Sequence, residues 1–247
     1  MNQPLRALVF DVDGTLADTE RFHLRAFNEG FVAEGLDWRW DPALYTRLLD
    51  ISGGKERMLA YWREVRGGTI DIEGGAMRDL IDRVHLAKTA AYEAMVQDGL
   101  VTLRPGVLAL MEEALSRGLR LAIATTTSPV NVSALLRRAV GPHWRLQFPV
   151  VCDASTAPRK KPHPEVYRQA LAGLGLPACA CVAFEDSANG LRAARAAGME
   201  AIVTPTAFTR DHDFTGALRV LPSLAGITVD DLAGWLGAQA ETAGALS

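Results

Sequence analysis

The sequence predicts an α/β fold in which a mostly parallel sheet carries an inserted helical domain. Three observations predict this fold: short apolar runs recur between turn residues, helical stretches separate them, and one long interval near the N-terminus breaks the alternation. Strands that alternate with helices favour a parallel sheet covered on both faces, because each crossover must travel back over the sheet. Continuous apolar runs also fit strands that are buried on both sides.

The predicted strands are six apolar runs of three to six residues. They are Ala7–Phe10, Leu119–Ala124, Phe148–Cys152, Cys181–Phe184, Ala201–Val203 and a weaker run, Leu218–Leu221. Helical spacing of apolar residues lies between them, at Gly106–Arg117, Val130–Val140, Pro164–Leu174 and Ala188–Ala197. We expect the tail from Gly237, rich in Ala and Gly, to be a frayed terminus.

Residues 17–103 break this rhythm and predict a separate helical domain. The interval is rich in Arg, Glu and Ala, and it contains amphipathic stretches at Phe22–Glu34, Lys55–Arg66 and Met77–Val96. It begins a few residues after the first strand, and Arg104-Pro105-Gly106 marks the return to the sheet. We therefore expect a core formed by residues 1–16 and 104–247, and a helical domain formed by residues 17–103.

Composition excludes some partners and compartments. The 247 residues are 49% hydrophobic, and the charged 22% nearly cancel to a net charge of −3, so no global field favours nucleic acid or an anionic membrane. No stretch reaches the length of a membrane span, and the first residues lack the apolar core of a secretion signal. Three cysteines, Cys152, Cys179 and Cys181, fit small buried residues in a reducing cytosol. We expect a cytoplasmic monomer with neither a nucleic-acid nor a membrane partner.

Two carboxylates directly follow the first predicted strand. Asp11 and Asp13 lie at its carboxyl end, where ligands bind in open α/β folds. Side chains near a strand repeat every two residues, so both carboxylates can point into the same crevice. Their charges would repel unless a cation or a shared proton relieved them, and Mg²⁺ prefers carboxylate oxygens. Gly14 then permits a tight turn, and Thr15 can bond back to the local backbone.

Later segments supply matching groups at the same end of the sheet. The second predicted strand runs into Thr125 and Thr126, where a hydroxyl and a backbone N–H can hold phosphate oxygens. Lys161 precedes a helix and can neutralise charge on a phosphate and on Asp11, whereas Lys160 is expected to be solvated.

A second acidic pair, Glu185 and Asp186, follows the strand Cys181–Phe184. Taken alone, these segments have ordinary explanations: an acidic turn, a helix cap or a basic turn. Together they predict an oxygen-rich Mg²⁺ site beside a phosphate site.

This constellation resembles the haloacid dehalogenase superfamily of phosphatases and mutases over nearly the whole chain. The similar motifs are Asp11-x-Asp13-Gly14-Thr15, Thr125, Lys161 and Glu185-Asp186. The resemblance implies a Rossmann-like catalytic core, with residues 17–103 as the family's mobile cap. It also implies that Asp11 attacks phosphorus and becomes an aspartyl phosphate, while Asp13 acts as acid and then as base. Catalytic roles for Thr125 and Lys161 follow in the same way. Mg²⁺ would be held by a carboxylate oxygen of Asp11, the backbone carbonyl of Asp13 and Asp186, with Glu185 next to these ligands as a further metal-site residue.

Within the superfamily the chain is similar to the CbbY-like group, which itself resembles β-phosphoglucomutase. The segments behind this similarity are Ala17-Asp18-Thr19-Glu20 with His23, Ser52-Gly53-Gly54-Lys55-Glu56-Arg57, Ala124-Thr125-Thr126-Thr127-Ser128 with Asn131, and Lys160-Lys161-Pro162. Members of this group remove phosphate from xylulose 1,5-bisphosphate. The similarity implies substrate-binding roles for Glu20, His23, Gly53, Gly54, Lys55, Arg57, Thr126 and Asn131.

The residues of the helical domain would select the substrate, because the core touches mostly the phosphate. Lys55 and Arg57 can reach a second phosphate, although a charged helix start explains them equally well. His23 can bond to Glu20 or to substrate, or be a structural helix histidine. In the related mutases the position of Glu20 is typically not acidic, which favours a phosphatase.

The leading hypothesis is therefore a Mg²⁺-dependent phosphatase that hydrolyses a small phosphorylated sugar. The favoured substrate is a sugar bisphosphate, xylulose 1,5-bisphosphate. The rival enzymes are a β-phosphoglucomutase-like mutase and a phosphoglycolate phosphatase. A phosphate-binding protein without turnover is the alternative from another class, and the intact set Asp11, Asp13, Lys161 and Asp186 opposes it, since a pure binder has no use for an acid–base group.

Overall fold

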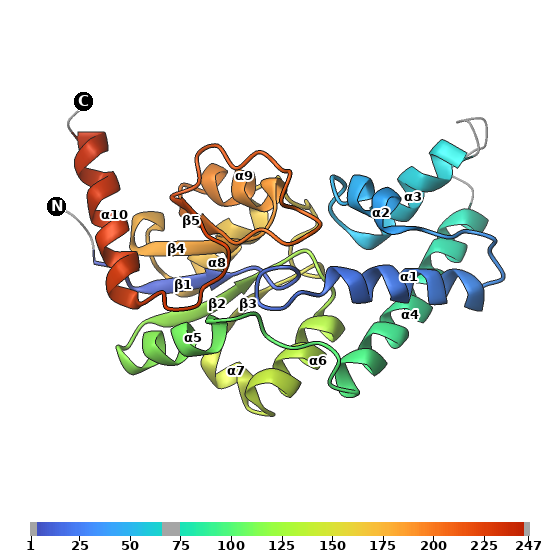
Figure 1. Ribbon diagram of the computed structural model, residues 1–247, viewed down its shortest axis with the longest axis horizontal. Coiled ribbons are helices and arrows are strands. Elements are labelled where there is room, and N and C mark those ends of the chain that lie inside the picture. The colour runs from blue at the N-terminus through green and yellow to red at the C-terminus, as the bar shows by residue number, and fades with distance from the viewer. Residues whose placement is uncertain (1–3, 66–74, 245–247) are drawn as a thin grey trace.

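A computed structural model describes residues 4–65 and 75–244 of the chain. These residues form two lobes (Figure 1): a sheet with helices on both faces, and a helical lobe beside the carboxyl ends of the strands. We call the first the sheet lobe. The helical lobe consists of α1 (Glu20–Ala33), α2 (Pro42–Leu48), α3 (Gly54–Val65) and α4 (Gly75–Gln97).

The six-stranded sheet formed by the described residues is parallel throughout, in the order β3-β2-β1-β4-β5-β6. Its strands are β1 (Ala7–Phe10), β2 (Arg120–Ala124), β3 (Val150–Cys152), β4 (Cys181–Glu185), β5 (Glu200–Val203) and β6 (Arg219–Val220). The chain starts in the middle, adds β2 and β3 on one side, and returns to add β4 on the other. This reversal opens a crevice between the carboxyl ends of β1 and β4. The α/β fold and the mostly parallel sheet are therefore confirmed.

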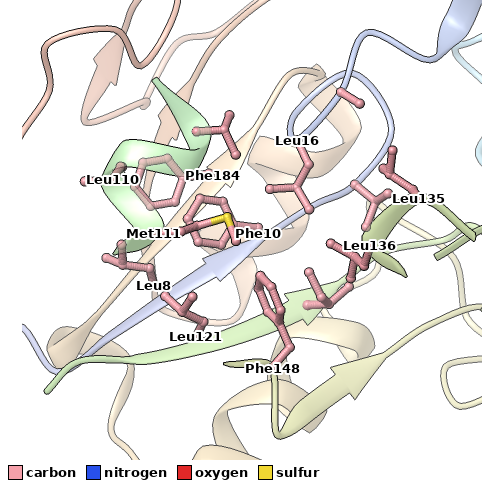
Figure 2. Packing of buried hydrophobic residues seen from close by; sticks show 14 of the residues in the cluster. Leu8, Phe10, Leu16, Leu110, Met111, Leu121, Leu135, Leu136, Phe148 and Phe184 are labelled. Carbon is pink, nitrogen blue, oxygen red and sulfur yellow. The ribbon is translucent and has the colours of Figure 1, made fainter. Parts of the chain in front are cut away.

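The two faces of the sheet bury side chains of different size. Alternate residues such as Leu8, Phe10 and Phe184 point to one face, where they pack against α5 (Val107–Ser116), α6 (Pro129–Val140) and α10 (Val229–Gly244). Figure 2 shows this packing, in which the rings of Phe10 and Phe184 stack with centroids 4.7 Å apart. The other face carries smaller residues such as Ala7, Val9 and Ala183 beneath α8 (Glu165–Leu174) and α9 (Ala188–Ala196). Burial on both faces explains the continuous apolar runs of the sequence.

The helical lobe has an apolar cluster of its own. Phe27 and Phe31 of α1 pack against Trp40, with ring centroids 4.8 Å and 4.9 Å apart. Tyr45 of α2 and Met58 of α3 are fully buried in the same cluster. The helical lobe also packs on the sheet lobe, because Tyr92, Met95 and Val96 of α4 belong to the larger apolar cluster that includes α6.

Two paired segments connect the lobes. Ala17 and Leu103 form an antiparallel bridge, and the backbone N–H of Arg104 donates to the carbonyl of Leu16 at 2.8 Å. The guanidinium of Arg104 also donates to the carbonyls of Gly14 and Thr204. The return to the sheet is therefore anchored at the predicted segment Arg104-Pro105-Gly106.

Several features differ from the sequence-based expectation. Helices α2, α7 (Trp144–Gln147) and α10 and a 3₁₀ turn at Ala178–Ala180 were not predicted, and α10 continues through the tail expected to fray. Cys179 is exposed rather than buried, because it lies in that surface turn. Residues 66–74 of the predicted helical domain lie outside the described residues, and they include Arg66, the last residue of the predicted helix Lys55–Arg66. Among the described residues, no helix has the length and apolar character that a membrane crossing needs.

Candidate active site

A cavity of about 410 Å³ lies between the carboxyl ends of the strands and the helical lobe. Its walls come from both lobes. Every residue assigned to the site from sequence lines it: Asp11, Asp13, Glu20, His23, Gly53, Gly54, Lys55, Arg57, Thr125, Thr126, Asn131, Lys161, Glu185 and Asp186. The structure thus brings together groups that are up to 175 positions apart in the chain.

A buried ion-pair network occupies the floor of the cavity. The register of β1 and β4 places Asp11 beside Glu185, and Lys161, from the loop before α8, reaches both. Lys161 Nζ lies 2.7 Å from Asp11 Oδ1 and 2.5 Å from Glu185 Oε1, and Tyr167 donates to the same Glu185 oxygen. Lys161 therefore lies beside Asp11, where its charge can act on a bound anion.

Burial and neighbouring charges set the protonation of this network. Burial raises the pKa of Asp11 to about 7, and repulsion from Glu185 adds to the shift, while the ammonium of Lys161 opposes both. Burial alone would lower the pKa of Lys161, but the charges of Asp11 and Glu185 raise it above the usual lysine value. Lys161 therefore stays charged beside Asp11.

Three carboxylates at this floor fit a hard cation. Oxygens of Asp11, Glu185 and Asp186 lie within 4.8 Å of one another. Burial, with repulsion from Asp11 and Glu185, raises the pKa of Asp186 well above its usual range, as expected for like charges held together. Glu185 Oε2 is buried without a hydrogen-bond partner among the described residues. Oxygen ligands of this kind are those that Mg²⁺ prefers.

Gly14 leaves room for this cluster. Its φ of 78° is in the left-handed region, and a Cβ at this position would lie 2.3 Å from Asp186 Oδ2. No side chain fits between the turn and the carboxylate. Thr15 was expected to bond back to the local backbone. Its buried Oγ1 instead has no hydrogen-bond partner among the described residues.

Asp13 is held by residues of the helical lobe. Its Oδ1 accepts hydrogen bonds from Thr19 Oγ1 and His23 Nε2, each at 2.9 Å. Lys88 Nζ lies 3.0 Å from His23 Nδ1, and the imidazole stacks on Tyr92 with centroids 4.2 Å apart. An ammonium can only donate, so Nδ1 accepts and Nε2 carries the proton that His23 donates to Asp13.

This chain of contacts keeps Asp13 ionised. Burial would raise the pKa of Asp13, but the interaction with His23, with smaller contributions from Lys88 and Thr19, holds that pKa well below its usual range. Burial lowers the pKa of Lys88 to about 8, and the charge of Asp13 opposes this. The carboxylate is therefore ready to accept a proton.

Hydroxyl and amide groups line the part of the cavity that follows the end of β2. Thr125 accepts a hydrogen bond from the backbone N–H of Thr127, and Asn131 donates to the Thr127 hydroxyl. Asn131 Oδ1 is buried without a partner among the described residues. Lys160 was expected to be solvated, but it lines the cavity and donates to the carbonyl of Ala154 at 3.1 Å.

The wall contributed by the helical lobe is anchored from behind. Glu20 Oε2 accepts a hydrogen bond of 2.6 Å from Tyr45, whose hydroxyl also accepts from Arg57 at 3.2 Å. Arg57 further donates to the carbonyls of Leu48 and Ile51. Lys55 lines the cavity, but its ammonium pairs with Asp82 at 2.6 Å. Of the two basic residues that the sequence suggested for a second phosphate, Arg57 is therefore the one whose side chain is held in place by several hydrogen bonds.

Sequence reasoning missed Lys88, His85 and Tyr45. Lys88 and His85 both line the cavity from α4, where Lys88 falls four residues from Val84 and from Tyr92 on the buried face. A lysine on an apolar stripe was the available signal for Lys88. Burial, with the nearby charge of Lys88, lowers the pKa of His85 to about 4.

The arrangement can carry out phosphoryl transfer. Asp11 offers a nucleophilic carboxylate, Asp13 offers a proton acceptor two residues away, and Lys161 supplies positive charge. The acidic cluster can hold a divalent ion at the same floor.

Comparisons with known proteins agree with this chemistry. The sequence model of the haloacid dehalogenase-like hydrolases matches residues 5–198. Protein CbbY (plasmid) of Cupriavidus necator is 54% identical over 220 residues, which are 89% of this chain and 86% of that protein. The crystal structure of an Asp-to-Asn variant of CbbY from Rhodobacter sphaeroides, in complex with xylulose 1,5-bisphosphate, is 44% identical with a TM-score of 0.85 over 92% of this chain and 99% of that one. A β-phosphoglucomutase from Clostridium difficile, 20% identical with a TM-score of 0.76 over 95% of this chain and 98% of that one, shares the fold.

Proposed function

The chain belongs to the haloacid dehalogenase-like hydrolase family and is a phosphatase, and from this premise we propose that it hydrolyses xylulose 1,5-bisphosphate through an aspartyl phosphate on Asp11. The observation that carries the proposal is the pairing of Asp11 with Lys161 at 2.7 Å in a cavity that Asp13 shares. The CbbY relative that binds this bisphosphate supports the choice of substrate. In this proposal residues 17–103 are the cap, and residues 1–16 and 104–247 are the catalytic core.

In the first step a carboxylate oxygen of Asp11 forms a bond to phosphorus and the bond from phosphorus to the sugar oxygen breaks. Lys161 offsets negative charge on the phosphoryl oxygens, and Thr125 and Thr126 orient them. The leaving sugar oxygen takes a proton from Asp13. Because Asp13 is ionised in the free protein, it must first take that proton from solvent, as the negatively charged phosphate approaches and raises the pKa of Asp13.

In the second step Asp13 accepts a proton from water as the water oxygen bonds to phosphorus and the bond to Asp11 breaks. His23 keeps the Asp13 carboxylate oriented in both steps through its hydrogen bond of 2.9 Å. The products are the sugar with its free hydroxyl and inorganic phosphate.

Mg²⁺ fits the acidic cluster of Asp11, Glu185 and Asp186, and the backbone carbonyl of Asp13 would complete its protein ligands. When bound, the ion would offset the negative charge that otherwise repels Asp11 from the phosphate. The raised pKa of Asp186 and the unpartnered Glu185 Oε2 support this assignment.

The helical lobe would bind the second phosphate. Arg57 has five N–H donors, and its hydrogen bonds to the described residues use three of them. The remaining donors and the nearby Lys55 would favour a bisphosphate over a monophosphate. Glu20 would meet a sugar hydroxyl between the two phosphates, whereas both ring nitrogens of His23 are engaged, with Asp13 and Lys88.

The test measures inorganic phosphate released from xylulose 1,5-bisphosphate, in parallel with conversion of β-glucose 1-phosphate to the 6-phosphate and with phosphate release from phosphoglycolate. We expect the bisphosphate to have the highest kcat/KM. Efficient interconversion of the glucose phosphates without phosphate release would make the protein a mutase. A preference for phosphoglycolate would show that the protein does not select its substrate by a second phosphate.

The nucleophile has its own test. Asp11→Asn should abolish turnover while the fold and ligand binding remain, which separates an enzyme from a phosphate-binding protein. Retention of full activity in this variant would refute the assignment of Asp11. Asp13→Asn should leave a longer-lived phosphoenzyme or none, and wild-type rates would remove Asp13 from acid–base catalysis.

A further inference from the structure

Besides the two connecting segments, the hydrogen bonds of Asp13 to the start of α1 and the packing of α4 on α6, a contact at α9 joins the lobes. Asn189, in the first turn of α9, donates from Nδ2 to the carbonyl of Asp50 at 2.8 Å and to Ser52 Oγ at 3.3 Å. Its Oδ1 accepts from Arg192 at 2.6 Å. A carbonyl only accepts and a guanidinium only donates, so the partners fix the orientation of the amide.

This contact joins two parts of the cavity wall. Asp186 of the acidic cluster lies three residues before Asn189, and Gly53 and Gly54, which line the cavity from the helical lobe, directly follow Ser52. The amide of Asn189 is about nine-tenths buried, which strengthens its hydrogen bonds.

Two weaker contacts lie nearby. The ring of Phe208, from the sheet lobe, packs edge-on against Tyr45 with centroids 5.8 Å apart. His212 Nε2 lies 3.9 Å from Asp50, whose side chain is 77% exposed, so this ion pair adds little. Asn189 therefore makes the most directional of these contacts between the lobes.

We propose that Asn189 is a positioning residue that holds residues 50–57 of the helical lobe over the cavity and thereby sets the affinity for the distal end of the phosphosugar. The hydrogen bonds of Asp13 to Thr19 and His23 and the packing of α4 on α6 hold α1 and α4 in place, whereas Asn189 holds the segment at Asp50 and Ser52. If the orientation that binds substrate is populated only in part, the apparent affinity falls by that fraction. The substrate readout of this inference rests on the proposed function, whereas its structural readout does not.

Asn189→Asp is the sharpest test, because it keeps the shape of the side chain and the contact with Arg192. It replaces a donor with an acceptor 2.8 Å from the carbonyl of Asp50. We expect KM for the phosphosugar to rise about tenfold while kcat stays within about twofold, since saturating substrate restores the bound orientation. For p-nitrophenyl phosphate, which has no distal phosphate, kcat/KM should change by less than about twofold. Asn189→Ala, which adds no charge near Asp186, should shift KM in the same direction.

Asn28→Ala is the matched control. Asn28 also makes two hydrogen bonds through its amide, both to the backbone of Trp40 within the helical lobe. Its loss should lower stability and leave KM for the phosphosugar unchanged. A fall in kcat at unchanged KM in the Asn189 variants would reduce Asn189 to a structural residue and overturn the proposal.

Hydrogen–deuterium exchange gives a readout that does not depend on the substrate. In the free protein, amides of residues 50–57 should exchange faster in Asn189→Asp than in wild type, and Asn28→Ala should leave them unchanged. If wild type hydrolyses no phosphosugar, the proposed function fails and this comparison still decides the role of Asn189. Unchanged exchange in residues 50–57 would overturn it.

Discussion

Lys88 is a buried ammonium whose nearest polar partner is an imidazole. Its Nζ lies 3.0 Å from His23 Nδ1, and no carboxylate among the described residues forms an ion pair with it within 4.0 Å. Burial lowers its pKa to about 8, although the charge of Asp13 works in the other direction. Holding this charge costs folding free energy, and in return it fixes the tautomer with which His23 donates to Asp13.

We predict that Lys88→Met separates stability from activity. The pKa of Lys88 falls from about 10.5 in the unfolded chain to about 8 in the folded protein, so its stabilising contribution is full above pH 10.5 and is lost as pH falls through 8. Wild type should therefore gain up to about 3 kcal/mol relative to the variant between these pH values. Urea unfolding at pH 7 and pH 10 measures this difference.

The same variant should lose roughly tenfold to a hundredfold in kcat/KM at neutral pH, because His23 is no longer held in one tautomer. Its stability at pH 7 should equal or exceed that of wild type. Unfolding free energies that change in parallel with pH in both proteins would contradict the burial cost assigned to Lys88.

The difference between Lys88 and Asp11 shows which site residues a sequence reveals. Asp11 was predictable because a strand end is visible in the sequence and its neighbour along the sheet, β4, also ends in carboxylates. Lys88 becomes a site residue only through the packing of α4 on α1, and no local pattern states which face of a helix meets a cavity. For Lys55 the motif suggested a phosphate contact and the residue lines the cavity, but the sequence did not show that its ammonium pairs with Asp82 of α4.

At the scale of elements, a strand or helix could be predicted where a local residue pattern determines it, and was missed where tertiary packing determines it. β1 was predicted at its observed bounds, because four consecutive buried apolar residues leave little choice. Helix α10 was not predicted, because its Ala and Gly residues give a weak apolar pattern, whereas Val229 and Leu232 pack into the sheet core and hold its first turn there. Tertiary packing rather than helix propensity stabilises it.

Gly106 fixes the start of α5 where the chain returns from the helical lobe. It has a φ of 85°, and a Cβ at this position would lie 2.0 Å from the carbonyl carbon of Leu224. Gly118 offers a matched comparison, since it also has a positive φ of 76° but nothing within 4 Å of its Cβ position.

We predict that Gly118→Ala lowers the free energy of unfolding by about 1–2 kcal/mol, the cost of left-handed backbone for an ordinary residue. Gly106→Ala should cost about twice that or more, because backbone of the loop at Leu224 must also move. Urea denaturation of both variants measures the two losses. Equal losses would mean that the close approach at Leu224 relaxes freely.

At the scale of the whole molecule, the sheet order concentrates negative charge at one point. Asp11, Glu185 and Asp186 meet where the chain reverses between β1 and β4. Their negative charge is offset chiefly by the ammonium of Lys161. Without a cation this cluster works against folding, as the raised pKa of Asp186 indicates. The fold therefore holds a built-in stability deficit that a divalent ion can relieve.

We predict that Mg²⁺ stabilises wild type and that Asp186→Asn reverses the order of stability. Without Mg²⁺ at pH 8 the variant should be the more stable protein, because one buried charge of the cluster is gone. Mg²⁺ at a hundred times its dissociation constant should add about 2.7 kcal/mol to wild type, roughly 5 to 10 °C in Tm, and little to the variant. Thermal unfolding with EDTA and with Mg²⁺ measures both effects.

Asp153→Asn is the control for this comparison, because Asp153 is a buried carboxylate that bonds to Ser155 outside the cluster. Its response to Mg²⁺ should match that of wild type. Stabilisation of all three proteins by the same amount would place the ion elsewhere, and stabilisation of none would leave the three carboxylates without the cation that their shared burial requires.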